Sequence, residues 1–158
     1  MNIDAPVSAI MSIDLKTLRG RDSIAKAKEI FDAYKIHHLP IIGFNTIKGI
    51  LSKADLIYFL RGSIRGKGDG LLEETRLKSW TVEEIMVEEV VTLQKDAPIQ
   101  NALEIFKENK VHCLCILDGQ KLVGVLTPHD IILGLLKNSW NKAFIKAAPI
   151  SNGSVKVE

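Results

Sequence analysis

Little in the sequence points to secretion or to a membrane. The chain of 158 residues has only two cysteines, Cys113 and Cys115, which stand two apart on an expected strand. Their side chains would share a face, but a disulfide between them would be badly strained. The longest apolar stretches, such as 131–136, are far too short to span a bilayer, and the amino terminus lacks a basic segment typical of secretion signals. We therefore expect a cytoplasmic protein with reduced thiols.

A strong excess of charge is also missing. The chain has 21 basic and 19 acidic residues and a net charge of +2. No strong field would therefore attract it to nucleic acid or to an anionic membrane. Arg61, Arg65 and Lys67 leave open the binding of nucleic acid or an effector protein through a basic linker. Such linkers are more often simply solvated, so this function ranks last.

Catalytic and phosphate-loop motifs are absent from the sequence. It contains no nucleophile elbow, no His-Glu-x-x-His segment and no pair of carboxylates on a recognisable scaffold. The glycine-rich stretch superficially suggests a phosphate loop. However, only three residues separate Gly62 from Gly66, and Lys67 is not followed by Ser or Thr. We therefore expect a protein that is not an enzyme.

What the sequence does contain is an internal duplication. Residues 7–60 align without a gap with residues 82–135, at an offset of 75, and 19 of the 54 aligned positions are identical. Such a duplication predicts two copies of one unit, related by a pseudo-two-fold axis and sharing a core. The predicted organisation is a first unit at 1–61, a linker at 62–80, a second unit at 81–137, and a C-terminal helix and flexible tail at 138–158.

Each unit is predicted to fold as β-α-β-β-α, which gives a mixed α+β fold. Apolar residues at helical spacing predict the first helix of each unit, from Ile24 to Tyr34 and from Ile99 to Phe106. Asp22 is a plausible N-cap in the first unit, and Pro98 suits an early helical position in the second. The expected strands lie near 16–18, 39–42 and 47–51, and near 91–93, 114–117 and 122–126.

The same short motif occurs where the last strand of each unit meets its second helix. A glycine, two aliphatic residues, a hydroxyl residue, two spacers and an aspartate run from Gly49 to Asp55 and from Gly124 to Asp130. A helix amino terminus favours phosphate, a carboxylate suits a ribose diol, and the glycine would let a flat base approach the backbone. The alternative is a helix cap, in which the aspartate pairs with Ser52 or Thr127. The two interpretations are compatible.

These residues resemble the cystathionine-β-synthase domain family, or CBS domains, which occur as tandem pairs. The resemblance rests on Ile-Met near the start of each unit, on the segment 37–42 and on the doubled junction, and it covers residues 7 to about 136. It implies a stand-alone pair, or Bateman module, with clefts between the units for AMP, ADP, ATP or S-adenosylmethionine. In that family the junction aspartate holds the ribose hydroxyls, and the Ser or Thr faces the phosphates.

The resemblance also implies further ligand residues. The family often has a basic residue at the positions of His37 and His112, where it reaches toward phosphates. A half-buried structural imidazole is the alternative for each. The family places the adenine pocket near Lys16 and Val91, with apolar walls from Ile36, Ile50, Val111 and Val125.

A zinc site is a sharper but less favoured alternative. Its ligands would be His37, His38, His112, Cys113 and Cys115. Their spacing matches no known zinc finger, and adjacent strand residues point to opposite faces. We therefore predict no metal site.

The predicted function is a non-enzymatic regulatory sensor of adenosine-derived ligands. It needs no obligatory cofactor, with magnesium accompanying the ligand only if that ligand is ATP. The resemblance favours a homodimer and a separate effector protein. The alternative is a structural dimerisation module with empty clefts. An apolar stripe after the second unit would seal the dimer or dock on its own unit: Trp140, Ala143, Phe144 and Ala147.

Overall fold

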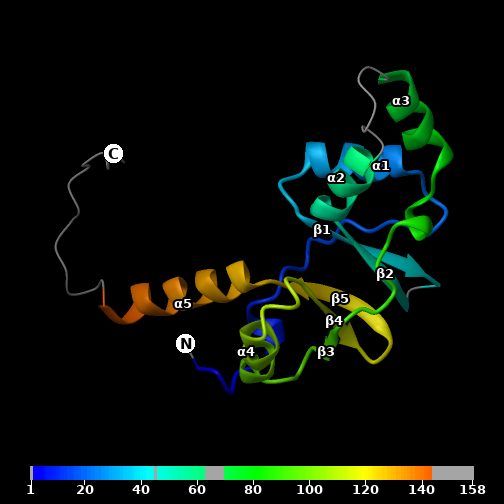
Figure 1. Cartoon of the computed structure of the whole chain (residues 1–158). Helices are drawn as coiled ribbons and strands as arrows, with labels where there is room; N and C mark the ends of the chain where they lie inside the picture. Colours follow the sequence, from blue (N-terminus) through cyan, green and yellow to red (C-terminus); the bar gives the residue numbers. More distant parts are fainter. Residues whose placement is uncertain (1, 45, 63–69, 144–158) are drawn as a thin grey trace, which may run out of the picture.

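The computed structural model describes residues 2–44, 46–62 and 70–143, and it contains two α+β units (Figure 1). The mixed α+β fold predicted from the sequence is therefore confirmed. The first unit consists of α1 (Ile24–Ala33), β1 (His38–Gly43), β2 (Thr46–Ser52) and α2 (Lys53–Gly62). The second consists of β3 (Thr92–Gln94), α4 (Ile99–Lys107), β4 (Leu114–Asp118), β5 (Lys121–Leu126) and α5 (Pro128–Ala143).

The two sheets differ at the strand predicted to begin each unit. Strands β1 and β2 pair antiparallel, whereas in the second unit β3 lies parallel to β4, which pairs antiparallel with β5. The expected strand near 16–18 is reduced to a single bridge between Leu18 and Ile41. Irregularities in register fall at matching places, after Ile41 and after Ile116. The duplication is therefore visible in the details of both hairpins.

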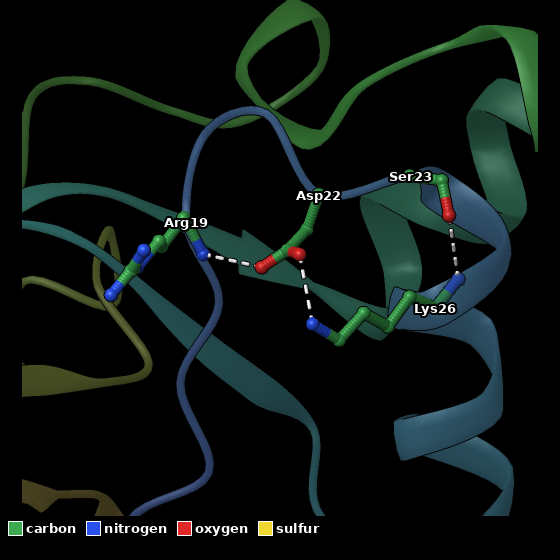
Figure 2. A network of polar contacts seen from close by, with 4 residues as sticks. All are labelled: Arg19, Asp22, Ser23 and Lys26. Carbon is green, nitrogen blue, oxygen red and sulfur yellow. Dashed lines mark hydrogen bonds and ion pairs between the residues drawn. The ribbon is translucent and has the colours of Figure 1, made fainter.

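The cap of α1 differs by one residue from the prediction. Figure 2 shows that Ser23, not Asp22, is the N-cap: its hydroxyl accepts a hydrogen bond from the Lys26 backbone N–H at 3.3 Å. The Asp22 carboxylate instead accepts from the Arg19 backbone N–H at 2.7 Å and from the Lys26 ammonium at 2.8 Å. Asp22 thus fixes the loop that enters the helix. Pro98 likewise is the N-cap of α4 rather than a residue of its first turn.

The predicted linker contains a helix that the sequence did not reveal. Helix α3 (Gly70–Ser79) follows the first unit, and its Leu77 packs against the core of that unit. The ring of Trp80 lies 5.1 Å from the ring of Phe59 on α2. The second half of the linker is therefore attached to the first unit. Arg65 and Lys67 lie outside the described residues.

The two units exchange their leading segments. The short helix η2 (Val82–Glu84) opens the second repeat, yet Val82 is fully buried in the core of the first unit. Reciprocally, η1 (Val7–Ala9) opens the first repeat, and Val7 is fully buried in the core of the second unit. Backbone bridges between Ser12 and Val125 and between Ile50 and Val87 extend the exchange. Neither core is complete without the other repeat.

The last helix continues beyond residue 137, where the second unit was predicted to end. Helix α5 runs without a break from Pro128 to Ala143, and Figure 1 shows it extending away from the body of the molecule. Residues 138–143 therefore continue this helix instead of starting a separate one. Phe144, Ala147 and the predicted tail lie outside the described residues. In the described ranges, no helix has both the length and the apolar character needed to cross a bilayer.

Candidate functional site

The junction between β5 and α5 is closed by a reciprocal cap around Asp130. One carboxylate oxygen, Oδ2, accepts hydrogen bonds from the Thr127 backbone N–H at 2.7 Å and from the Thr127 hydroxyl at 2.6 Å. The other, Oδ1, accepts from the hydroxyl of Ser12 at 2.9 Å. Ser12 belongs to the leading segment of the first repeat. The capping interpretation therefore holds, with a donor from the other repeat added to it.

The junction between β2 and α2 has the same cap without the third donor. Oδ2 of Asp55 accepts from the Ser52 backbone N–H at 3.2 Å and from the Ser52 hydroxyl at 2.5 Å. Among the described residues, Oδ1 of Asp55 accepts no hydrogen bond. The bridge partner that matches Ser12 here is Val87, which has no hydroxyl to donate.

A cavity of about 900 Å³ opens beside Asp130. Its walls come from the leading segment 11–16, from 35–40 of the first unit, and from 112–113 and 125–130 of the second. The structure brings together seven of the predicted ligand residues there: Lys16, Ile36, His37, His112, Val125, Thr127 and Asp130. The volume lies within the range of pockets that hold cofactors and small metabolites.

The other predicted residues do not line this cavity. Ser52 and Asp55 form the matching junction of the first unit. Ile50 is engaged in the bridge to Val87. Val91 and Val111 also lie apart, with Val111 packed against the core of the second unit. These residues therefore do not form part of the cavity at Asp130, and their ligand roles remain predictions.

The two junction glycines lie against methionines of the leading segments, and their expected role in letting a base approach the backbone stays a prediction. A Cβ added at Gly49 would lie 2.9 Å from Cγ of Met86, and one added at Gly124 would lie 2.9 Å from Cγ of Met11. Each methionine belongs to the leading segment contributed by the other repeat. Glycine is needed because the methionine already fills the space that a side chain would take.

Basic side chains lie in the wall of the cavity. Lys16 pairs with Asp14 at 2.9 Å, and its ammonium lies 4.7 Å above the ring centre of Tyr34. The hydrogen bond that the Lys16 ammonium donates to the Asp14 carboxylate raises the pKa of Lys16. His37 and His112 are exposed in the cavity wall, so the alternative of a half-buried structural imidazole fits neither. Their imidazoles are free to meet a ligand.

His38 differs from both of these histidines. It is half-buried in the cavity wall, and burial, followed by the neighbouring His37 and His112, lowers its pKa below the ordinary value of 6.5. The Asp55 carboxylate acts in the opposite direction. The folded protein therefore favours a neutral imidazole at this position.

Protonation of His38 gives the stability a predictable pH dependence. Below pH 6.5 the unfolded chain binds the proton before the folded one, so stability falls as the pH drops toward the folded-state pKa. We expect the slope from this group to be at most about 1.4 kcal/mol per pH unit. In His38→Gln the thermal midpoint should depend less on pH between about pH 7 and pH 5 than in the native chain. The same change at the exposed His129 should not reduce this dependence. Equal slopes in both variants would contradict this assignment.

Both cysteine thiols are free and buried. Burial raises the pKa of the Cys113 thiol, and the nearby Cys115 and Asp130 add to the effect; burial raises the pKa of Cys115 to about 12. In the part of the chain that the structure describes, no group of three His, Cys, Asp or Glu side chains is placed to hold a metal ion.

Sequence reasoning missed Ser12 as a site residue. The repeat alignment sets Ser12 against Val87, so it drew attention away from the position. A usable signal was present, because Ser12 directly follows the Ile-Met pair that begins the repeat. Only the exchange of leading segments brings its hydroxyl to Asp130.

Similar proteins carry the same architecture. The chain is 31% identical over 123 residues to an uncharacterised protein of Methanocaldococcus jannaschii, covering 72% of this chain and 43% of that one. A structure described as CBSX2 in complex with AMP, a protein of Arabidopsis thaliana, has a TM-score of 0.70 at 24% identity, over 85% of this chain and 98% of that one. The CBS domain pair of protein MJ0100, in complex with 5′-methylthioadenosine and S-adenosyl-L-methionine, has a TM-score of 0.68 at 24% identity, over 84% and 97%.

The family assignment rests on both repeats. The chain spans only 23%, 43% and 21% of the length of three curated relatives that it matches, so it corresponds to one part of those proteins. The model of the CBS domain matches residues 7–62 and again residues 82–137. With two matched repeats and the fold of a CBS pair, the chain belongs to the CBS domain family.

Proposed function

We propose that this protein is a non-enzymatic regulatory module that binds an adenosine-derived ligand in the cavity beside Asp130. The observation that carries the proposal is the state of that carboxylate. Asp130 is held in place at the cavity wall by hydrogen bonds, yet no cation in the described part of the chain forms an ion pair with it. A fixed, negatively charged acceptor without a counter-ion is suited to the hydroxyl donors of a ribose.

The rest of the cavity suits the other parts of such a ligand. Lys16 and Lys35 supply positive charge for phosphates, and His37 and His112 supply imidazole nitrogens that can form hydrogen bonds. The Thr127 hydroxyl already donates to Asp130, so in this state phosphates would depend on those cations and on the helix terminus. Apolar wall residues offer surface for a base: Ile13, Ile36 and Val125.

The ligands of similar proteins support the adenosine class. AMP is bound by one of them, and 5′-methylthioadenosine and S-adenosyl-L-methionine by another, and the adenosine moiety is common to all three. We propose a second ligand site at Asp55, including Gly49, Ile50 and Ser52, on the ground that the junction is repeated. Magnesium would enter only together with a ligand such as ATP.

A thermal-shift titration tests this function. We expect an adenine ligand among AMP, ADP, ATP and S-adenosylmethionine to raise the midpoint as its concentration passes the dissociation constant. Asp55→Ala with Asp130→Ala should abolish the shift, because each aspartate supplies a charged acceptor. GTP is the matched control for the base. No shift with any adenine ligand would instead favour the alternative, a structural module with empty clefts.

We also propose that the module forms a homodimer and acts in the cytoplasm on a separate effector. The support for the dimer is that the second helix of each unit has exposed apolar side chains: Ile57 and Tyr58 on α2, and Ile132, Leu133, Leu135 and Leu136 on α5. Two such helices from each chain would hide a large apolar area on pairing.

One charge placed in this surface should separate the subunits. We expect Leu136→Asp to produce a monomer at concentrations at which the native chain is dimeric, because the carboxylate would be buried without a partner. Sedimentation velocity reads the result directly. Lys137→Ala, which makes the same change in net charge one residue later, should leave the dimer intact. A native chain that is monomeric throughout would remove the proposal.

A further inference from the structure

We propose that Ser12 occupies part of the ribose site on Asp130 and thereby makes this cleft the weaker and less diol-selective of the pair. The proposal rests on the function proposed above and adds to it a residue that sets specificity. It starts from the only hydroxyl that the described structure brings to Asp130 from the other repeat, at 2.9 Å.

The number of acceptor sites on the carboxylate carries the argument. An ionised carboxylate accepts about four hydrogen bonds, two at each oxygen. At Asp130 the backbone N–H and hydroxyl of Thr127 take both places on Oδ2, and Ser12 takes one place on Oδ1. One place is left. A vicinal diol that donates twice must therefore displace Ser12 or leave one of its hydroxyls unpaired.

The Asp55 carboxylate has more free acceptor sites than that of Asp130. Ser52 takes both places on Oδ2, and no described residue donates to Oδ1. Two places are free on one oxygen, which is what the two hydroxyls of a ribose require. The backbone bridges of Ser12 to Val125 and of Val87 to Ile50 match each other across the repeat. The difference between the two junctions thus comes from one side chain, a serine against a valine.

Displacing Ser12 also has a structural consequence. Its hydrogen bond joins the leading segment of the first repeat to the last helix of the second unit. Ribose binding at Asp130 would exchange this contact between repeats for a contact with the ligand, whereas binding at Asp55 breaks no such contact. The two clefts would then differ in affinity and in what their occupation does to the packing of the units.

The experiment measures the affinity of AMP for each cleft in the full chain by isothermal titration calorimetry. Asp55→Ala leaves only the Asp130 cleft, and Asp130→Ala leaves only the Asp55 cleft. In the first background we expect Ser12→Val to tighten AMP binding by about threefold to tenfold, the scale of one exposed hydrogen bond. In the second, Val87→Ser should weaken it by a similar factor. Valine is already accommodated at the matching bridge, so Ser12→Val should fold.

Two controls separate the hydroxyl from other effects. Ser12→Thr keeps the donor and should leave the AMP affinity of the Asp130 cleft within about twofold of that with serine. Removing the 2′-hydroxyl from AMP should reduce the affinity less at the Asp130 cleft than at the Asp55 cleft. Ser12→Val should remove that difference. Ser12→Val that binds AMP equally or more weakly would overturn the inference while leaving the proposed function in place. A native chain that binds no AMP would overturn both.

Discussion

Val82→Asp is expected to unfold the first unit, although Val82 belongs to the second repeat. Its side chain is fully buried in the core that contains Ile24, Leu39 and Leu51. A carboxylate placed there would have no cation beside it, and burial of an unpaired charge costs several kcal/mol. We expect a loss of about 4 kcal/mol or more, a large part of the stability of a domain of this size.

Hydrogen exchange can locate the damage. In Val82→Asp we expect amide protection to be lost first in α1, β1 and β2, and in the mirror variant Val7→Asp first in α4, β4 and β5. Ile13→Asp makes a similar change at a side chain that is 73% exposed and should leave both patterns unchanged. If Val82→Asp instead deprotects the second unit first, the exchange of leading segments is wrong.

The sequence predicted the elements whose signals are local. The offset of 75 residues identified the two units, and the helical spacing from Ile24 predicted α1. The hydrophobic runs placed the four hairpin strands to within a residue or two. The doubled junction also led directly to Asp130, because a strand that ends in a capped helix leaves a recognisable order of residue types.

The exchange of leading segments could not be predicted in the same way. Val7 and Val82 occupy equivalent positions, and nothing in either repeat states whether such a residue packs on its own unit or on the other one. Helix α3 was missed because its segment is polar and follows several glycines, so it lacks a clear apolar stripe. Its attachment through Leu77 depends on a surface formed only by the folded first unit.

The exchange explains why the site residues are spread over both repeats. The segment that completes the second core with Val7 continues to Met11 and Ser12 and then to Lys16 in the cavity wall. Its position is fixed by the bridge of Ser12 to Val125, with hydrogen bonds of 2.9 Å and 3.0 Å between their backbones. A change that moves this segment would therefore alter stability and the shape of the cleft together.

Gly124→Val is the substitution expected to have that double effect. The new side chain would need the space that Met11 fills, and the Ser12 backbone oxygen lies only 3.2 Å from the added Cβ. We expect a loss of about 2 to 4 kcal/mol, since overpacking is costly where backbone must move as well as a side chain. Because Ser12 would be pushed from Val125, its hydrogen bond to Asp130 should also be lost. Denaturant unfolding measures the first effect, and proximity of the Ser12 and Asp130 side chains by NMR measures the second.

Two further variants test whether the clash with Met11 causes the loss of stability in Gly124→Val. Gly43→Val places the same side chain at the end of β1, where the three atoms nearest to the added Cβ belong to the flexible side chain of Lys48, so it should cost far less. Met11→Ala should recover part of the loss in Gly124→Val, because it vacates the contested space, although it is itself destabilising in the native background. If the losses in unfolding free energy from Met11→Ala and Gly124→Val simply add in the double variant, the space filled by Met11 is not the reason for glycine at position 124. If the double variant is more stable than this sum predicts, glycine is required at the junction because the exchanged segment with Met11 packs against it. That segment also forms one wall of the cleft.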